Sequence, residues 1–382
     1  MGGFHSKVSV FDAAVGGRQV GICKFIGQRP NYWDLRYILI LYICSIRTLF
    51  LKGFKMKIVR LGRTGVPVSQ LCFGTMSFGG QADRSEAKNL YAACRHAGVM
   101  FFDCANVYGN GLAEEFLGSL IASERNEIIL TTKCGGEPYV KSQDKKFVRG
   151  ANRRLIMASV EASLKRLKTE YLDILFMHRW DDKTPLDQTL HALDDLVRSG
   201  KVLYLGCSNY AAYQIATALG IQRASGLASF DIIQPMYNLV KRQAEVEILP
   251  LAQAEDMGVI SYGPGGAGLL TGKYTLEAKP DNARLTTNLG YTKRYDEVWY
   301  YETAAKFAKL AKSWSYHPLT LAVAWAGSHP SVTCPIIGAR NTEQLKASLA
   351  AADLELSDEQ RNEISALSRT PPVATDRLEE QR

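Results

Sequence analysis

Residues 172–206 read LDILFMHRWDDKTPLDQTLHALDDLVRSGKVLYLG, and this stretch decides the fold. It opens with an apolar run, Leu172 to Phe176, which is typical of a buried strand. Pro185 to Arg198 then has the apolar period of an amphipathic helix, and Val202 to Gly206 is a second apolar run. The stretch therefore predicts one strand–helix–strand unit of a parallel sheet.

The same alternation of short apolar runs and helical segments continues on both sides of this stretch, from Lys57 onward. Other helical segments include Arg84 to His96 and Asn152 to Leu167. Eight such units in about 300 residues predict an α/β fold, the closed (β/α)8 TIM barrel, with an N-terminal β-hairpin at Lys57 to Val68 and C-terminal helices. The predicted strands are 71–74, 101–103, 128–131, 172–176, 202–206, 231–234, 259–262 and 334–337.

The chain falls into three predicted parts. Residues 56–370 carry the barrel pattern, and residues 371–382 follow it as a tail. Residues 1–55 form an extension that we expect to be disordered or to precede a true start at Met56. The apolar run Tyr37 to Ile46 is much shorter than the roughly 20 residues that span a bilayer, so we expect no membrane partner, with a membrane-surface anchor as the alternative.

Charge and cysteine usage exclude several classes of function. Of the 46 basic and 38 acidic residues, eight basic and two acidic ones lie in residues 1–55. The charges of the remaining residues are nearly balanced, so we expect no nucleic-acid partner. The 8 cysteines form no CxxC pair, as expected for reduced thiols in a cytoplasmic protein. The 6 histidines show no metal-ligand spacing, so we expect no metal site.

Four polar side chains lie at the ends of consecutive predicted strands. Asp103 and Tyr108 follow the second strand, Lys133 the third and His178 the fourth. Each has an ordinary structural explanation when it is taken alone. The C-terminal ends of barrel strands converge on one mouth, however, where barrel enzymes hold their catalytic groups. Together the four residues predict one catalytic site.

The chemistry of this set suits the reduction of a carbonyl group. A phenol with its ordinary pKa of about 10 is too weak an acid near neutrality unless it is helped. An adjacent ammonium lowers the pKa of the phenol, and a carboxylate keeps that ammonium charged. Tyr108, Lys133 and Asp103 fit these roles. His178 would orient the substrate oxygen.

Several segments occur in an order that is known from one enzyme family. They are FFDCANVYG at 101–109, AEEFLG at 113–118, Thr132-Lys133, MHRWD at 177–181 and GKVLYLGCSN at 200–209. They resemble the aldo-keto reductase superfamily, most closely the branch of aryl-alcohol dehydrogenase-like reductases and potassium-channel β subunits. The resemblance implies an NADP-dependent oxidoreductase that transfers hydride from NADPH to an aldehyde or ketone, with Tyr108 as the general acid.

The resemblance also implies residues that bind NADPH. Ser208, Asn209 and Gln234 would hold the carboxamide. Tyr237 would stack on the nicotinamide, and Arg340 would bind the 2′-phosphate. The remaining expected contacts are Gly74, Thr75, Met76, Asp103, Gly263, Pro264, Gly265, Gly268, Leu269, Lys273, Gly338, Gln344 and Ser348.

Two positions depart from the family pattern. Gly263 stands where the family has a serine, which removes one phosphate contact, and Ser348 stands where the family places an asparagine against the adenine. The loop GPGGAGLLTGK at 263–273 also contains GxGxxG, which is typical of an open dinucleotide-binding sheet. That fingerprint follows a first strand, whereas this loop follows a seventh, so we interpret it as the pyrophosphate loop of a barrel.

Other features allow weaker interpretations. Trp180 and Met76 are candidates for the substrate pocket, and residues 285–299 for a lid over it. Cys104 and Cys134 should point away from the mouth as inert thiols, because strand side chains alternate. The alternative function is a redox-sensing regulatory subunit that binds NADPH with little turnover. Both hypotheses fit the same four residues, and NADPH consumption with aldehydes distinguishes them.

Overall fold

The computed structural model describes residues 10–15, 18–23, 56–135, 150–275, 279–281, 283–375, 377 and 379. The chain divides into two compact units, Met1–Gly53 and Phe54–Arg382. In the first unit, β1 (Val10–Val15) and β2 (Arg18–Cys23) form an antiparallel hairpin. The rest of the prediction for residues 1–55, including the apolar run, lies outside the described residues.

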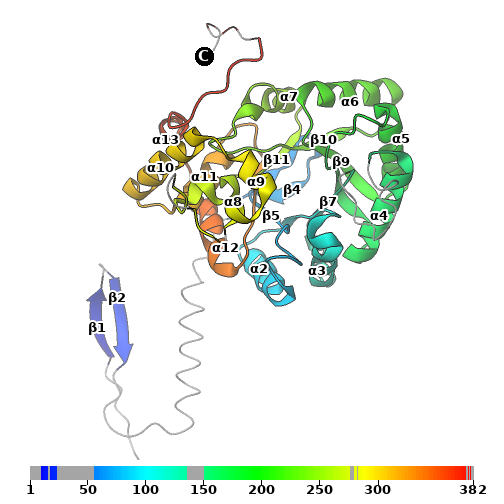
Figure 1. Cartoon of the computed structure of the whole chain (residues 1–382). Coiled ribbons are helices and arrows are strands. Elements are labelled where there is room, and N and C mark those ends of the chain that lie inside the picture. Colours follow the sequence, from blue (N-terminus) through cyan, green and yellow to red (C-terminus); the bar gives the residue numbers. More distant parts are fainter. Residues whose placement is uncertain are drawn as a thin grey trace, which may run out of the picture. The chain divides into compact units, whose positions relative to one another are not determined.

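Eight parallel strands of the second unit close into a barrel, which confirms the predicted TIM-barrel fold (Figure 1). All eight predicted strands are present. The third extends to Cys134, so that Lys133 lies inside it and not after it. The strands are β5 (Cys72–Gly74), β6 (Phe101–Asp103), β7 (Ile129–Cys134), β8 (Leu172–Met177), β9 (Val202–Ser208), β10 (Phe230–Gln234), β11 (Gly258–Tyr262) and β12 (Cys334–Ile337).

Helices surround the strands, and α8 to α11 and α13 gather on one side of the barrel (Figure 1). The three predicted helices are confirmed at α2 (Arg84–His96), α4 (Arg153–Leu167) and α5 (Leu186–Arg198). Among the described residues no helix is long and apolar enough to cross a membrane. The other helices are α3 (Leu112–Ile121), α6 (Ala212–Ser225), α7 (Ile248–Ala254), α8 (Arg284–Thr287), α9 (Leu289–Arg294), α10 (Val298–Ser313), α11 (Pro318–Gly327), α12 (Thr342–Leu349) and α13 (Asp358–Ser365), and the 3-10 turns include η2 (Tyr108–Gly111), η5 (Gln243–Glu245) and η6 (Gly266–Thr271).

A hairpin closes the N-terminal end of the barrel. β3 (Ile58–Arg60) pairs antiparallel with β4 (Pro67–Ser69), as predicted. Arg63 in the turn donates to Asp231 at 2.8 Å, near the start of β10. Because apolar side chains fill this end, we expect the site at the other end of the barrel. The interior cluster that the hairpin completes contains Leu61, Val68, Cys72, Phe101, Ile174, Phe176, Ile232, Ile260 and Cys334.

Side-chain alternation along the strands shows which residues near the mouth also face the inside of the barrel. Residues two positions apart in a strand face the same side of the sheet. Asp103 therefore follows Phe101 on the inside of β6, and Tyr262 follows Ile260 on the inside of β11. The polar residues of the mouth stand on a floor of buried apolar side chains.

Two glycines in the turn between β3 and β4 allow a test of how tightly the hairpin packs against the barrel. Gly62 has a φ of +50°, and a Cβ added to it would lie 2.2 Å from the Gly258 nitrogen. Gly65 has a φ of +72° and no atom within 4 Å of an added Cβ. Both substitutions to alanine carry the left-handed cost of about 1–2 kcal/mol, but Gly62→Ala also forces hairpin and barrel apart. We expect Gly62→Ala to lower the free energy of unfolding in urea by about 2 kcal/mol more than Gly65→Ala. Equal losses would contradict tight packing of the turn.

Candidate active site

A buried ion pair lies inside the barrel at the mouth. Lys133 Nζ lies 2.6 Å from Oδ2 and 2.8 Å from Oδ1 of Asp103. Thr131 Oγ1 and Gln234 Nε2 also donate to Asp103 Oδ1, at 2.8 and 2.9 Å. Burial opposes the charged form of Lys133, but the charge and hydrogen bonds of Asp103, aided by Tyr108, outweigh it and raise the pKa of Lys133. The ammonium is therefore charged at neutral pH.

Tyr108 lies against this ammonium. Lys133 Nζ donates to Tyr108 Oη at 3.2 Å and lies 4.8 Å from the centroid of the ring. Burial raises the pKa of Tyr108 to about 12, and the charge of Lys133 lowers it by a smaller amount. The expected effect of Lys133 is present, but desolvation exceeds it. Tyr108 is therefore a neutral phenol that keeps its proton near pH 7.

His178 faces Tyr108 from the end of β8. The two rings meet edge to face with centroids 6.1 Å apart. Burial lowers the pKa of His178 to about 3, and the charges of Lys133 and Arg179 act in the same direction. Its Nδ1 is buried and has no hydrogen-bond partner among the described residues. The site thus combines a charged ammonium with two neutral groups that can hydrogen-bond to an oxygen.

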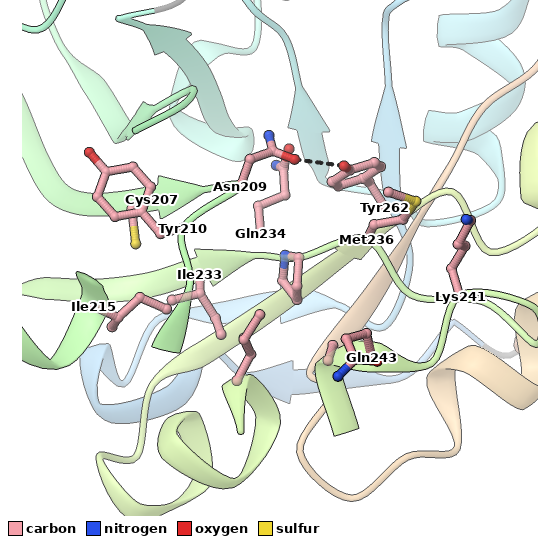
Figure 2. A pocket seen from close by; sticks show the side chains of 13 residues that line it. Cys207, Asn209, Tyr210, Ile215, Ile233, Gln234, Met236, Lys241, Gln243 and Tyr262 are labelled. Atoms are coloured by element: carbon pink, nitrogen blue, oxygen red, sulfur yellow. Dashed lines mark hydrogen bonds between the residues drawn. The ribbon is translucent and has the colours of Figure 1, made fainter. Parts of the chain in front are cut away.

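Polar groups from β9, β10 and β11 continue the mouth beside His178. Asn209 Nδ2 donates to the His178 carbonyl at 2.9 Å, and Tyr262 Oη donates to Asn209 Oδ1 at 2.7 Å (Figure 2). Ser208 Oγ donates to the Gln234 carbonyl at 2.9 Å. Asn209, Gln234 and Tyr262 border a cavity of about 230 Å³ whose other walls are mainly apolar. The cavity walls include Cys207, Tyr210, Ile215, Ile233, Pro235, Met236, Lys241 and Ile248 (Figure 2).

The structure corrects the expected position of Tyr237. Its ring is fully buried and stacks on Trp325 with centroids 5.0 Å apart, and its hydroxyl donates to Glu245. Tyr237 lies beyond the end of β10, where strand alternation no longer controls the side chain. Tyr262, at the end of β11, is a further aromatic residue of the mouth and is only partly buried. Alternation from Ile260 in the predicted seventh strand was a signal that could have identified it.

The loop after β11 holds residues expected to contact the pyrophosphate, and the loop after β12 holds those expected at the adenosine end. Lys273 follows η6, and Arg340 follows β12, where its backbone nitrogen donates to Gln344 Oε1 at 3.2 Å. Partial burial lowers the pKa of Lys273, and so do the charges of Arg340 and Arg284. Arg284 therefore adds to the positive charge that acts on Lys273, although it lies more than ten residues beyond the loop in sequence.

The other expected contacts differ in their exposure. Ser348 is buried in α12, which leaves little of its side chain for an adenine because that face of the helix packs inward. Thr75 is buried and donates to the Asp103 carbonyl at 3.0 Å, while Met76 is exposed. Leu269 and Pro264 are buried, and Gly74, Gly263, Gly265, Gly268 and Gly338 retain some exposure.

The remaining predictions concern neighbouring side chains. Cys104 and Cys134 are buried, and burial raises the pKa of both thiols, as predicted for inert cysteines. Trp180 is half-buried and packs edge to face on Tyr210, which lines the cavity, with centroids 5.2 Å apart. Residues 285–299 fold into the end of α8, all of α9 and the start of α10. A role for this segment as a lid stays a prediction.

Comparison with known proteins identifies the family. Residues 70–369 match the model of the aldo/keto reductase family. The chain is 36% identical to a probable voltage-gated potassium channel subunit beta of Arabidopsis thaliana, over 78% of this chain and 92% of the relative. It is 36% identical to an uncharacterised oxidoreductase of Bacillus subtilis, over 80% and 93%, and 32% identical to the norsolorinic acid reductase of Aspergillus flavus, over 78% of each.

The matched region contains the barrel, the buried ion pair and both rings that face it. Its length and the coverage of the relatives leave no large part of the barrel unmatched. This chain belongs to the aldo/keto reductase family.

Proposed function

We propose that this protein reduces the carbonyl group of an aldehyde or ketone with NADPH, in a reaction that is reversible with the alcohol. The observation that carries the proposal is the contact of a buried, charged Lys133 with the neutral hydroxyl of Tyr108. A neutral phenol can give up a proton, and an adjacent ammonium stabilises the phenolate that remains.

Each of the four residues at the mouth would have a separate role in the reaction. When bound, NADPH would supply the hydride that the carbonyl carbon accepts. Tyr108 donates its proton to the carbonyl oxygen, and Lys133 stabilises the resulting phenolate. Asp103 keeps Lys133 charged and in place through two hydrogen bonds. His178, which is neutral, would hydrogen-bond to the same oxygen and so orient the substrate.

The polar groups around the mouth fit the two ends of NADPH. Ser208, Asn209 and Gln234 offer amide and hydroxyl groups to a carboxamide. Tyr262 offers the face of a partly exposed ring to the nicotinamide, in place of the buried Tyr237. The positive charges of Lys273, Arg284 and Arg340 suit the phosphates of NADPH. Guanidinium groups bind phosphate through paired, charge-assisted hydrogen bonds, which supports NADPH over NADH.

A regulatory subunit with little turnover is the second candidate, because the relatives include probable potassium-channel β subunits. The neutral phenol and imidazole at the mouth favour the reductase. The phenol can donate a proton and the imidazole can hydrogen-bond to a carbonyl oxygen, and a protein that only binds NADPH needs neither group. Multiple-turnover oxidation of NADPH by an aromatic aldehyde would support the reductase, and fewer than about one turnover per hour would support the regulatory subunit.

Tyr108→Phe tests the proton donor. The substitution removes the hydroxyl and keeps the ring, so we expect reduction to fall by 10² to 10⁴-fold, the usual contribution of a general acid. NADPH affinity, measured by fluorescence titration, should stay within about threefold because the hydroxyl is not among the cofactor contacts. A variant that retains a third of the wild-type rate would rule out Tyr108 as the acid.

The neutral state of His178 makes stability depend on pH. The unfolded chain binds a proton with a pKa near 6.5, whereas the folded chain binds it near 3, so stability falls as the pH drops below about 6.5. This histidine contributes up to about 1.4 kcal/mol per pH unit to the slope. Urea unfolding between pH 5 and 6.5 should therefore show a shallower slope for His178→Asn.

His329 provides the matched comparison for that measurement. Burial lowers the pKa of His329 to about 4, with the charge of Arg361 acting in the same direction. His329→Asn should remove a similar part of the slope, and the two effects should add. An unchanged slope in His178→Asn would mean that folded His178 binds a proton in this range.

Arg340→Ala tests the choice of cofactor. Charge-assisted hydrogen bonds are worth about 1.5 to 3 kcal/mol each, while the ribose hydroxyl of NADH carries no charge to attract the guanidinium. We expect the KM for NADPH to rise at least tenfold and the KM for NADH to stay nearly constant in steady-state assays. Equal weakening toward both cofactors would assign Arg340 to support of the loop.

A further inference from the structure

The C-terminal helix α13 is joined to the loop after β10 through one arginine. Arg361 of α13 donates through Nη2 to the Oη of Tyr237 at 3.0 Å. Through Nη1 it donates to the Trp325 carbonyl and to Ser328 Oγ, both at 2.7 Å. Its guanidinium carbon also lies 5.1 Å from the centroid of the Trp325 ring. Arg361 therefore contacts both members of the stacked pair that Tyr237 forms with Trp325.

A carboxylate fixes the hydroxyl of Tyr237 from the loop itself. This hydroxyl donates to Glu245 Oε1 at 2.6 Å, and Glu245 accepts from Arg242 Nε and Nη2 at 3.0 and 2.9 Å. Arg242 Nη1 in turn donates to the carbonyl of Ser365, one turn beyond Arg361 in α13, at 3.1 Å. The Tyr237 hydroxyl thus donates one hydrogen bond and accepts another, so the ring is fixed at its tip as well as at its face.

The backbone around Tyr237 is paired with the end of β11. The Tyr262 nitrogen donates to the Pro235 carbonyl at 2.9 Å, and the Tyr237 nitrogen donates to the Tyr262 carbonyl at 3.1 Å. Asn238 Nδ2 donates to the next carbonyl, that of Gly263, at 2.9 Å. Three hydrogen bonds thus connect this segment with Tyr262, which is proposed to face the nicotinamide, and with Gly263, which begins the expected pyrophosphate loop.

The direction of Tyr262 depends on this pairing. On the β12 side Tyr262 pairs with Ile336. On the other side the register between β10 and β11 ends at Val259, so the segment around Tyr237 supplies the pairing of Tyr262 there. The Tyr262 hydroxyl donates to Asn209 Oδ1 at 2.7 Å. A displacement of Tyr237 would therefore displace Tyr262 and disturb its hydrogen bond to Asn209.

We propose that Arg361 is a positioning residue for NADPH, which acts through Tyr237 to keep Tyr262 and Asn209 in the arrangement that binds the nicotinamide. The proposal rests on the NADPH binding proposed above. Arginine suits the role because its rigid fork of donors bonds a phenol, a carbonyl and a hydroxyl at once. A site that is ordered before the cofactor arrives does not lose affinity to ordering on binding. Tyr237 thus acts on the nicotinamide through Tyr262 and not by contact.

The test measures the binding of two ligands to the full chain by calorimetry. They are NADPH and 2′,5′-ADP, which keeps the adenosine end and lacks the nicotinamide. We expect Arg361→Gln to raise the Kd for NADPH about fivefold, as for a site that is competent about a fifth of the time, and to leave the Kd for 2′,5′-ADP within about twofold. Tyr237→Phe removes only the hydroxyl and should act in the same direction. Arg361→Lys should recover part of the NADPH affinity.

Arg125 provides the matched control. Its guanidinium also donates to backbone carbonyls, those of Ile128 and Tyr171, at 3.0 Å, and it lies 4.1 Å from the centroid of the Tyr171 ring. It precedes β7, however, at the end of the barrel away from the mouth. Arg125→Gln should lower the free energy of unfolding in urea and leave the Kd for NADPH within about twofold, because distant sites act independently. Hydrogen exchange of residues 235–238 without NADPH should be faster in Arg361→Gln and unchanged in Arg125→Gln.

Each outcome decides the proposal. Unchanged NADPH binding in either Arg361→Gln or Tyr237→Phe overturns it. Equal losses toward NADPH and 2′,5′-ADP, or an equal loss of NADPH affinity in Arg125→Gln, also overturn it because they show a general loosening of the fold. If Arg361→Gln does not fold, Tyr237→Phe and Arg361→Lys decide by the same comparison. A wild-type protein that binds NADPH but reduces no carbonyl refutes the reductase function alone, and one that binds no NADPH overturns both.

Discussion

The ion pair between Lys133 and Asp103 is the constraint on which the rest of the site depends. Two charges without access to water are stable only when their geometry is good and the remaining donors and acceptors are satisfied, and the loss of one partner typically costs 3–5 kcal/mol. Here Asp103 accepts hydrogen bonds from Thr131 and Gln234 in addition to Lys133. The pair therefore ties β6, β7 and β10 together across the inside of the barrel.

Burial of this pair sets the protonation of its neighbours. The same exclusion of water that strengthens the attraction between Lys133 and Asp103 disfavours a phenolate at Tyr108 and an imidazolium at His178. The ion pair is thus bordered by two neutral groups, Tyr108 and His178, which differ from it in carrying no charge. A developing negative charge on a substrate oxygen would be the group that the site stabilises best.

The two ends of the barrel have separate tasks. The β3–β4 hairpin fills the N-terminal end with apolar side chains, which supports stability. The C-terminal end carries loops that bring arginines and tyrosines to the mouth, and these loops vary between barrel enzymes while the strands stay the same. The strands therefore carry the features shared with the aldo/keto reductase family.

The sequence by itself determined the barrel and the places of Asp103, Lys133 and His178, because the period of apolar residues and the alternation along a strand are local properties. Only the tertiary structure decided that Tyr237 does not face the mouth, since Tyr237 lies beyond its strand and packs on the distant Trp325. It also decided that desolvation exceeds the effect of Lys133 on Tyr108. Such effects depend on which distant segments exclude water from a side chain. The local sequence pattern does not show which segments these are.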